Sequence, residues 1–520
     1  MGNTPDSGVT LAEVLAAYSL AIDLGLGQPM EHLIRSWRIA VRLGGHVGVP
    51  DDQQPALFHM AMLAWVGCVA DSPEVVAWFG DDIAFRADSY EADLGGLAGL
   101  RFFLSRAGAG GTLPHRFLVA ARLLSTGGGQ IVQGLQGHCL TTSILADQLG
   151  LGASVSTALR QFFARWDGQG VPPGVGGEDI ALPVRLFQLA DIAEVHHRSG
   201  GVAAARLVAM ARRGKQFDPD LVDVFCSVAP QVLVDGDDDR DAHRLLRSEP
   251  ELGRPLSETE LDHALTALAD FTDLRSTYRA GHSRGVAELA AHAAGALGLA
   301  AADVSATRRA GFVHDIGLHG VAATVLDKPG TLSPTERERI RASSYYTDRV
   351  LSRPAALACI GSIAALVHER MDGSGYHRGV GGGAIAMPGR VLAAACAFRA
   401  MTEPRPHRGA LTAKQAATTL RGEARAGRLD ADAVAAVLAA AGQAGPAKVA
   451  RPCGLTTREL QVLDLIARGA TTREVARRLG IAQKTAGTHI ERIYTKTGAS
   501  SRSTATLFAL RNGLLDSLDL

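Results

Sequence analysis

The chain has 520 residues, which is too long for one ordinary hydrophobic core and predicts about three domains. Its composition, 47% hydrophobic and 20% charged, is typical of a globular protein. Its 53 basic residues equal its 53 acidic ones, so the overall charge does not favour a polyanionic partner. The six cysteines form no CxxC pair, and the sequence shows neither a signal peptide nor an apolar run long enough for a membrane span, so we expect a cytoplasmic protein with reduced thiols and no membrane partner.

The first part of the chain has the residue spacing of packed helices. From Leu11 onward, apolar residues recur every three or four positions, as in LAEVLAAYSLAIDLGLG, and strand patterns are sparse. The same pattern continues to about residue 225, interrupted by loops rich in glycine and proline. We therefore predict an all-α domain over residues 8–235.

An acidic stretch that contains proline, DGDDDRDAHRLLRSEPELGRP, separates this domain from a second helical region. Ser257 and Glu260 have the spacing of a capping box, and Ser333, Pro334 and Glu336 form another helix start. We predict a second helical domain over residues 255–440. The small-residue segment AGQAGPAKVARPCG is then a linker, residues 441–454, before a C-terminal module over residues 455–520.

One loop occurs twice. Residues 165–185, RWDGQGVPPGVGGEDIALPVR, return at 370–390 as RMDGSGYHRGVGGGAIAMPGR, with twelve of twenty-one positions identical at a fixed offset of 205. Glycines at fixed places in a turn are a constraint on the backbone, so a match this dense indicates two copies of one unit. The two helical domains are therefore predicted to share a fold.

The C-terminal module has the pattern of a helix-turn-helix. Thr456 with Glu459, and Thr471 with Glu474, are capping boxes that open two amphipathic runs, and the glycine turn LGIAQ follows the second run. The next helix presents short polar and basic groups that suit the bases and phosphates of a major groove. We predict that the DNA-binding residues are Lys484, Thr485, Gly487, Thr488, Glu491, Arg492 and Lys496.

The motifs LTxRExxVLxLIAxG, EVAxxLGI and KTxxTHIxxIYxKTG resemble the LuxR-type DNA-binding domain across the whole module. The resemblance implies four helices, with the third in the groove of double-stranded DNA and the fourth used for dimerisation. It implies base contacts by Gly487, Thr488 and Glu491 and phosphate contacts by Lys484, Thr485 and Lys496. Two positions depart from it: Ala482 lacks the usual serine cap, at a cost of about 1 kcal/mol, and Ala486 replaces valine. A plain helical bundle with basic solvated faces is the alternative.

The second helical domain contains, in order, TYRAGHSRGV, RAGFVHDIGLHG and LVHERMDGSGYHRG. Imidazoles and carboxylates from separate helices are ligands of divalent cations, and a pair of such ions would activate water for phosphoryl hydrolysis. The ordered set resembles the HD superfamily of metal-dependent phosphohydrolases, specifically the HD-GYP branch that hydrolyses cyclic di-GMP, over residues 265–420. The resemblance implies metal ligation by His282, His314, Asp315 and His368, with Cys396 as a marginal ligand and Asp315 as the catalytic residue of an active enzyme.

Several positions of that ligand set are replaced in the second domain. Ser343 and Val367 stand where histidines are expected, and Cys396 stands where an aspartate is expected; Leu318 and His377 replace a lysine and a proline. Loss of a carboxylate and imidazoles should remove a second metal position. We expect one divalent metal ion at most, with a Cys396 thiolate favouring zinc. A hydrogen-bonded polar core without metal is the alternative.

In the first domain, the ligand positions that are replaced are mostly the ones that the second domain keeps. His138 and Asp191, each 205 positions before its counterpart, are kept, whereas Gly67-Cys68 aligns with the His-Asp pair and Phe162-Phe163 with the histidine pair. This alignment requires roughly forty inserted residues between positions 69 and 137. The first domain is therefore not expected to be an enzyme by itself.

Three functions remain open from the sequence. The chain is a transcription regulator whose HD-like domains sense a nucleotide or small-molecule effector and support a homodimer, or a phosphohydrolase of the cyclic di-GMP phosphodiesterase kind with a DNA-binding module, or a dimerisation platform. The replaced ligands favour the regulator over the enzyme.

Overall fold

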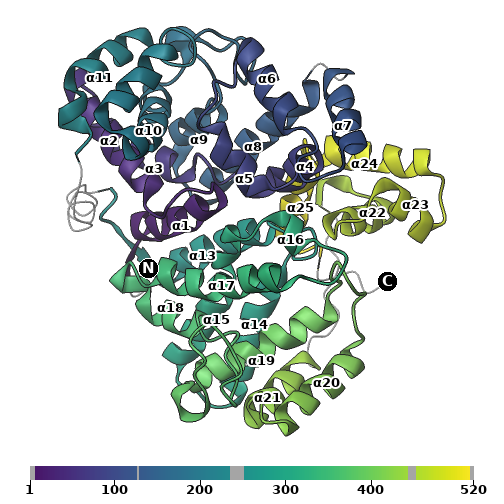
Figure 1. The fold of residues 1–520 in the computed structure, drawn as a ribbon. Coiled ribbons are helices and arrows are strands. Elements are labelled where there is room, and N and C mark those ends of the chain that lie inside the picture. Colours follow the sequence, from purple (N-terminus) through teal and green to yellow (C-terminus); the bar gives the residue numbers. More distant parts are fainter. Residues whose placement is uncertain (1–5, 126–127, 235–250, 443–451, 516–520) are drawn as a thin grey trace. The chain divides into compact units, whose positions relative to one another are not determined.

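The computed structural model describes residues 6–125, 128–234, 251–442 and 452–515, and helices form almost all of its regular structure (Figure 1). Within these ranges the strands are two short ones, β1 (Asp6–Thr10) and β2 (Pro255–Ser257), which pair antiparallel with Asp6 opposite Ser257. The all-α prediction is confirmed. The chain divides into two compact units, residues 1–264 and 265–520.

In the first unit, α10 packs against α2 and α3 around a core that includes Leu43, Phe58 and Phe187. A capping box of Thr10 and Glu13 starts the first helix. The helices are α1 (Leu11–Gly25), α2 (His32–Val47), α3 (Gln54–Leu63), α4 (Cys68–Phe79), α5 (Asp82–Ser89), α6 (Gly96–Arg106), α7 (Leu113–Ser125), α8 (Gly129–Gln148), α9 (Gly152–Arg160), α10 (Leu182–Ala211) and α11 (Pro219–Val232), with 3-10 turns η1 (Asp51–Gln53) and η2 (Gly177–Asp179).

In the second unit, α14 packs against α15, α19 and α21, and the predicted box of Ser333 and Glu336 starts α17. The helices that precede the C-terminal module are α13 (Glu258–Asp273), α14 (His282–Ala296), α15 (Ala301–Val313), α16 (Ala323–Leu326), α17 (Pro334–Leu351), α18 (Ala358–Ala364), α19 (Met387–Thr402), α20 (Ala413–Arg425) and α21 (Ala431–Ala441). The 3-10 turns are η3 (Ile316–Gly320), η4 (Ala355–Leu357) and η5 (Gly382–Ala384), and the module consists of η6 (Pro452–Gly454), α22 (Thr457–Ala467), α23 (Thr472–Leu479), α24 (Gln483–Thr497) and α25 (Arg502–Arg511).

The doubled loop has the same backbone in both units. Val171 N–H donates to Phe163 O at 2.9 Å, and Tyr376 N–H, 205 positions later, donates to His368 O at 3.2 Å. In each unit a long helix, α10 or α19, then starts at the same offset. The conserved hydrogen bond explains the repeated sequence, because glycine is required where the chain folds back on itself: a side chain at Gly375 would collide with backbone atoms of the segment before it.

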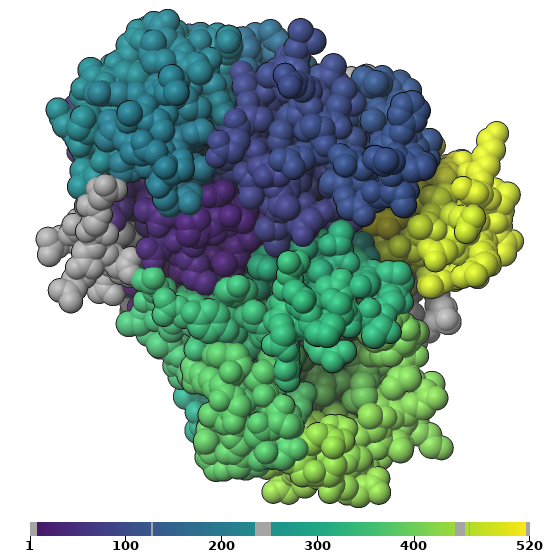
Figure 2. Space-filling model, viewed as in Figure 1, coloured from purple at the N-terminus to yellow at the C-terminus, as the bar shows by residue number. Residues whose placement is uncertain are grey.

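An insertion distinguishes the first unit from the second. Helices α2 and α14 are 250 positions apart, but α8 and α17 are 205 apart, so the first unit has 45 extra residues before α8. This segment contains α4 to α7 and lies on the surface of the first unit (Figure 2). On α7, Leu113 and Phe117 are exposed.

One stretch, Asp51–Phe79, is long and apolar enough to cross a membrane by length and composition, and the sequence reading had expected none. Much of it is buried inside the unit, and it comprises η1, α3 and α4 with a turn between the two α-helices. We interpret it as a pair of core helices.

Gly375→Ala should destabilise the second unit by about 1–3 kcal/mol, because the new methyl group has no room. The matched control is Gly383→Ala in the same loop, where nothing lies within 4 Å of the added carbon, and this variant should stay within about 0.5 kcal/mol of the wild type. Urea unfolding followed by circular dichroism measures both. Equal stability of the two variants would contradict the assigned loop backbone.

Candidate functional site

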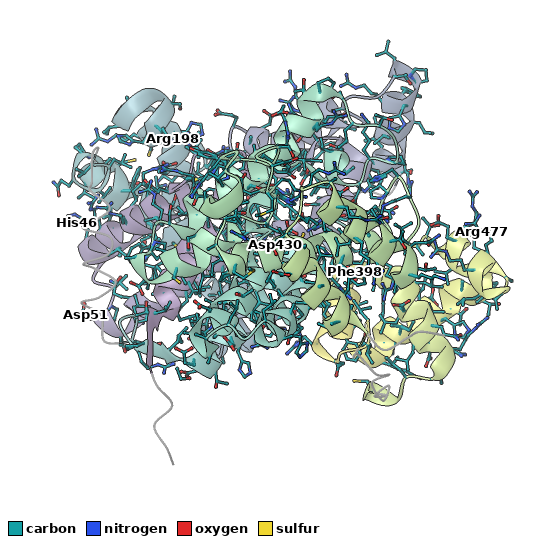
Figure 3. All side chains as sticks on the ribbon, turned by 90° about the horizontal axis from the view of Figure 1, so that it is seen from below. His46, Asp51, Arg198, Phe398, Asp430 and Arg477 are labelled. Carbon is teal, nitrogen blue, oxygen red and sulfur yellow. The ribbon has the colours of Figure 1, made fainter. Side chains whose placement is uncertain are left out.

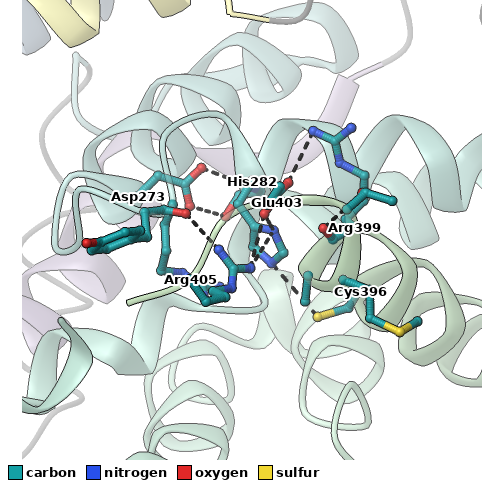
Figure 4. Close-up of polar contacts among 12 residues, drawn as sticks. Asp273, His282, Cys396, Arg399, Glu403 and Arg405 are labelled. Atoms are coloured by element: carbon teal, nitrogen blue, oxygen red, sulfur yellow. Dashed lines mark hydrogen bonds and ion pairs between the residues drawn. The ribbon is translucent and has the colours of Figure 1, made fainter. Parts of the chain in front are cut away.

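His282 and His314 lie in the buried centre of the second unit. His282 is the first residue of α14, and its Nδ1 lies 2.7 Å from Glu403 Oε2. Arg399 and Arg405 hold the same carboxylate at 3.2 and 3.1 Å (Figure 4). Burial alone would raise the pKa of Glu403, but His282 and the two arginines hold it well below its usual range. The glutamate therefore accepts the Nδ1 proton and directs Nε2 of His282 to the centre.

The predicted His-Asp pair ends α15. His314 Nδ1 donates to Gly311 O at 2.7 Å, while its buried Nε2 has no hydrogen-bond partner among the described residues. Asp315 Oδ2 lies 3.2 Å from that Nε2 and 3.7 Å from Nε2 of His282. Burial, with the charge of Arg279, lowers the pKa of His314 to about 3. Both imidazoles are thus neutral and present a lone pair, as metal ligation requires.

Cys396 completes a three-donor group. Its Sγ lies 3.9 Å from His282 Nε2, and the ligand atoms of His282, His314 and Cys396 all lie within 4.8 Å of one another. Two imidazoles and a thiol are donors that suit zinc, and each histidine is oriented by a hydrogen bond from its other ring nitrogen. The unpartnered Nε2 of His314 shows that the residues present fit one ion.

Arg279 brings a positive charge into the same centre. Its guanidinium makes an ion pair with Asp315 Oδ2, and the whole side chain is nearly enclosed. Ser343 and Val367, where histidines were expected, are buried residues. A second cation next to Asp315 would meet the charge of Arg279 and would lack those ligands, so this donor set does not fit a pair of ions.

His368 lies outside the three-donor group. Its ring stacks on Tyr376 with ring centroids 4.9 Å apart. Burial, together with the charges of Arg370, His314 and Arg279, lowers the pKa of His368 to about 3. The predicted fourth ligand is therefore near the centre but is not one of the clustered donors.

The structure corrects the alignment of the first unit. Gly67 faces His138, and a side chain there would collide with it, just as one at Gly317 would collide with Ser343, the counterpart of His138. Gly67 is therefore equivalent to Gly317, and Ala64-Trp65, not Gly67-Cys68, takes the place of His314-Asp315. The sequence alignment was wrong by three residues because of the insertion that follows Gly67.

Aromatic rings fill the corresponding centre of the first unit. Trp65 Nε1 donates to Asp191 Oδ2 at 3.1 Å. The indole packs edge-on against Phe162, Phe163 and His138 with ring centroids 5.0 to 6.1 Å apart. Because an indole occupies the space and offers no ligand atom, this centre does not fit a metal ion.

His32 is the counterpart of His282 and has the opposite charge state. Its Nδ1 lies 2.6 Å from Glu194 and its Nε2 2.9 Å from Asp191. Burial alone would lower the pKa of His32, but the two carboxylates raise it to about 10. His32 is therefore an imidazolium in a buried ion-pair network rather than a ligand.

The C-terminal module is a helix-turn-helix on its own apolar core. Leu463 and Ile466 of α22, Val475 of α23 and Ile493 of α24 meet in that core. Both predicted capping boxes are present, and Gly480 adopts φ 63° between α23 and α24. Ala482 caps α24 without a side-chain hydrogen bond, as its sequence departure suggested. Arg477 is exposed and projects outward from α23 (Figure 3).

Most predicted DNA-contacting side chains are exposed on one helix, α24. The exposed ones are Lys484, Thr485, Thr488, Glu491, Arg492 and Lys496, and Gly487 is half-buried. Lys496 Nζ lies 2.7 Å from Glu459 Oε2. Burial alone would raise the pKa of Glu459, but Lys496 and Thr456 hold it at about 2. Lys496 is thus already paired, and a phosphate would have to compete with Glu459 for it.

The loop before α14 contacts both the centre and the module within the second unit. Arg279 pairs with Asp315, and the next residue, Ala280, packs against the apolar core of the module. An added Cβ at Gly281 would lie 3.2 Å from Leu510 of α25. Residues 279–281 therefore link the metal-binding geometry to the helix-turn-helix, a connection that no sequence motif indicated.

Comparison with known families agrees with these two sites. Residues 266–433 match the HD domain family, and residues 454–509 match the luxR family of bacterial regulatory proteins. The chain thus contains an HD-type, phosphodiesterase-like domain followed by a LuxR-type DNA-binding domain.

Individual relatives define the combination more closely. The chain is 29% identical over 405 residues to 3′3′-cGAMP-specific phosphodiesterase 3 of Vibrio cholerae, covering 77% of this chain and 88% of that protein. A crystal structure of a cyclic GMP-AMP specific phosphodiesterase of V. cholerae matches with a TM-score of 0.59 and 26% identity, over 84% of this chain and 98% of that one. That coverage exceeds the second unit, so the similarity of fold includes the first. The DNA-binding module is 45% identical over 62 residues to the transcriptional regulatory protein LiaR of Bacillus subtilis, covering 12% of this chain and 29% of LiaR.

Raising the pH should selectively destabilise the first unit through His32. Its folded pKa of about 10 lies above the unfolded value of 6.5, so the imidazolium contributes fully below pH 6.5 and its contribution is lost as the pH rises toward 10. His32→Gln should remove that pH dependence. Urea unfolding followed by tryptophan fluorescence reports on this unit, because all four tryptophans lie in it.

The control for this experiment is His59→Gln, since burial lowers the pKa of His59 to about 4 and leaves it neutral above pH 6.5. The control should shift stability by a constant amount between pH 6.5 and 10. A wild-type protein whose pH dependence equals that of His32→Gln would contradict the ion-pair assignment.

Proposed function

We propose that this chain is a DNA-binding transcriptional regulator whose tandem HD-like domains sense an effector and associate, and no longer hydrolyse phosphodiesters efficiently. The observation that supports it is that protein side chains occupy both HD-like centres: Arg279 pairs with Asp315 in the second, and Trp65 fills the first. The proposed domain boundaries are residues 8–235, 255–440 and 455–520, with a linker over 441–454. Because a transcriptional regulator acts on DNA, the proposed location of the protein is the cytoplasm.

One divalent ion in the second domain is part of the proposal. His282, His314 and Cys396 would hold it, with Asp315 adjacent, and a bound ion there supplies Lewis-acid chemistry. Glu403 fixes the tautomer of His282, and Gly311 fixes that of His314. Arg279 neutralises the carboxylate that a catalytic site would use, so the residues favour binding over hydrolysis.

The proposed signal path runs through residues 279–281. A metal ion or ligand that takes Asp315 from Arg279 releases the loop that packs on the helix-turn-helix. Because relatives of this chain are named for cyclic dinucleotides, a nucleotide of that class is the proposed effector. A homodimer is the proposed assembly, supported by the exposed Leu113 and Phe117 of α7. Sedimentation of the full chain tests it, and a monomer at all concentrations would count against it.

The second candidate function is a cyclic-dinucleotide phosphodiesterase with a DNA-binding module. The match to the HD domain family and the similarity to phosphodiesterases favour it. In that case Asp315 would be the catalytic residue, and Arg279 would have to leave it during each turnover.

Metal content and turnover distinguish the two functions. His314→Ala should lower the metal bound per chain by one ion, whereas His263→Ala, at an exposed histidine on α13, should leave it unchanged. Wild-type protein loaded with zinc or manganese should not hydrolyse cyclic di-GMP or 3′3′-cGAMP. Elemental analysis and chromatography of the nucleotides measure both quantities. Loss of two ions in His314→Ala together with brisk turnover by the wild type would establish the enzyme instead.

Two substitutions on α24 should separate affinity from specificity. Lys484→Ala should weaken binding to all DNA sequences and reduce the salt slope by about 1, because one phosphate contact is lost. Thr488→Ala should change the preferred sequence, as expected for a base contact. Fluorescence anisotropy with operators selected from genomic fragments measures both. The control is Lys414→Ala, an exposed lysine on α20, and DNA binding by both α24 variants at its level would refute the helix assignment.

A further inference from the structure

The first unit contains a second cluster of donor atoms, which shares only His138 with the centre that Trp65 fills. Cys68, Asp71 and His138 each offer one ligand atom, and these atoms lie within 4.8 Å of one another. Cys68 and Asp71 belong to α4, the first helix of the insertion, and His138 belongs to α8. Neither family resemblance implies ligation by Cys68 or Asp71.

The local sequence explains why the donors meet. Residues three apart lie on one face of a helix, so Cys68 and Asp71 point the same way from the first turn of α4. Gly67 allows that turn to touch α8, since any side chain at Gly67 would collide with His138. The glycine thus brings the thiol and the carboxylate to the imidazole.

His138 and Asp71 are each oriented by a partner on the side away from the cluster. His138 Nε2 lies 2.8 Å from Ala64 O, which leaves Nδ1 toward Asp71 Oδ2 at 3.3 Å. Asp71 uses Oδ1 to bind Arg86 at 2.7 Å, so Oδ2 is directed at the cluster. Metal-bound histidines and carboxylates are held in this way by backbone carbonyls and outer cations.

The charges around the cluster balance with a divalent cation in it. Asp82 offsets the charge of Arg86 at 2.8 Å, which leaves Asp71 to face the cluster. Cys68 is the first residue of α4, so its thiol lies beside the N-terminus of that helix. Without an ion, burial alone would lower the pKa of His138, but Cys68 and Asp71 hold it well above its usual range. A thiolate and a carboxylate together would neutralise one divalent ion, and that ion would take the place of the proton on His138 Nδ1.

We propose that Cys68, Asp71 and His138 form a zinc site. The 3.3 Å between His138 Nδ1 and Asp71 Oδ2 matches the ~3.4 Å edge of a tetrahedron with metal–ligand bonds of about 2.1 Å. Sulfur, nitrogen and oxygen donors together select zinc over magnesium or calcium. Three protein ligands leave the fourth position for water. The ion fastens the start of the insertion to α8.

Cobalt substitution tests the site, because a cobalt–thiolate bond gives a charge-transfer band that other ligands do not. Cys396 of the second unit also offers a thiol, so the starting variant is Cys396→Ala in the full chain. It should retain one thiolate-bound cobalt ion, and Cys68→Ala in that background should lose the band. Cys139→Ala in the same background is the matched control, since this buried thiol lies next to His138 but outside the cluster, and it should keep the band.

A folded Cys396→Ala protein without the band would overturn the proposal and would leave the cluster as an ion-pair network of His138, Asp71 and Arg86. Should that variant not fold, the wild type serves: Cys68→Ala must lower its thiolate-bound cobalt by one ion per chain. No loss of cobalt in Cys68→Ala would refute the site equally. Circular dichroism of metal-free proteins checks that each variant is folded.

Discussion

A hydrogen bond from the Nδ1–H of a helix-opening histidine to a buried glutamate organises the centre of each helical unit. Glu403 binds His282, and Glu194 binds His32, at almost equal distances. In both cases the carboxylate fixes which ring nitrogen points inward. The rest of each centre, whether donors or aromatic rings, is arranged around that fixed imidazole.

The groups that face Nε2 of this histidine then determine whether the imidazole is neutral or charged. In the second unit Nε2 of His282 faces a thiol and a carboxylate already paired with Arg279, and the imidazole stays neutral. In the first unit it faces Asp191, and the imidazole is charged. One repeated framework thus holds a neutral imidazole in one copy and a structural cation in the other.

Much of this could be predicted from the sequence. The glycine spacing of the repeated loop indicated two copies of one fold, and the capping boxes located the helices of the DNA-binding module. The resemblance to the HD-GYP branch identified the replaced ligands Ser343, Val367 and Cys396, and the constant offset of 205 then located His138 and Asp191 in the first domain. Arg279 could not, since its role depends on a loop that folds back onto Asp315. The equivalence of Trp65 with Asp315 was also hidden, because the 45 extra residues follow Gly67, two positions later, and an alignment shifted by three residues gave a similar match.

The two glutamates come from different turns of equivalent helices, so the acid and the base occupy exchanged positions in the two copies. On α10 the order is Glu194 then Arg198, and at the corresponding positions of α19 it is Arg399 then Glu403. Either order places one acid beside the imidazole and one base beside the acid. Exchanging a single member, however, would leave two like charges one helical turn apart beside the imidazole. The two positions are thus coupled: reversing the charge at one of them is compatible with the buried imidazole only if the charge at the other is reversed too.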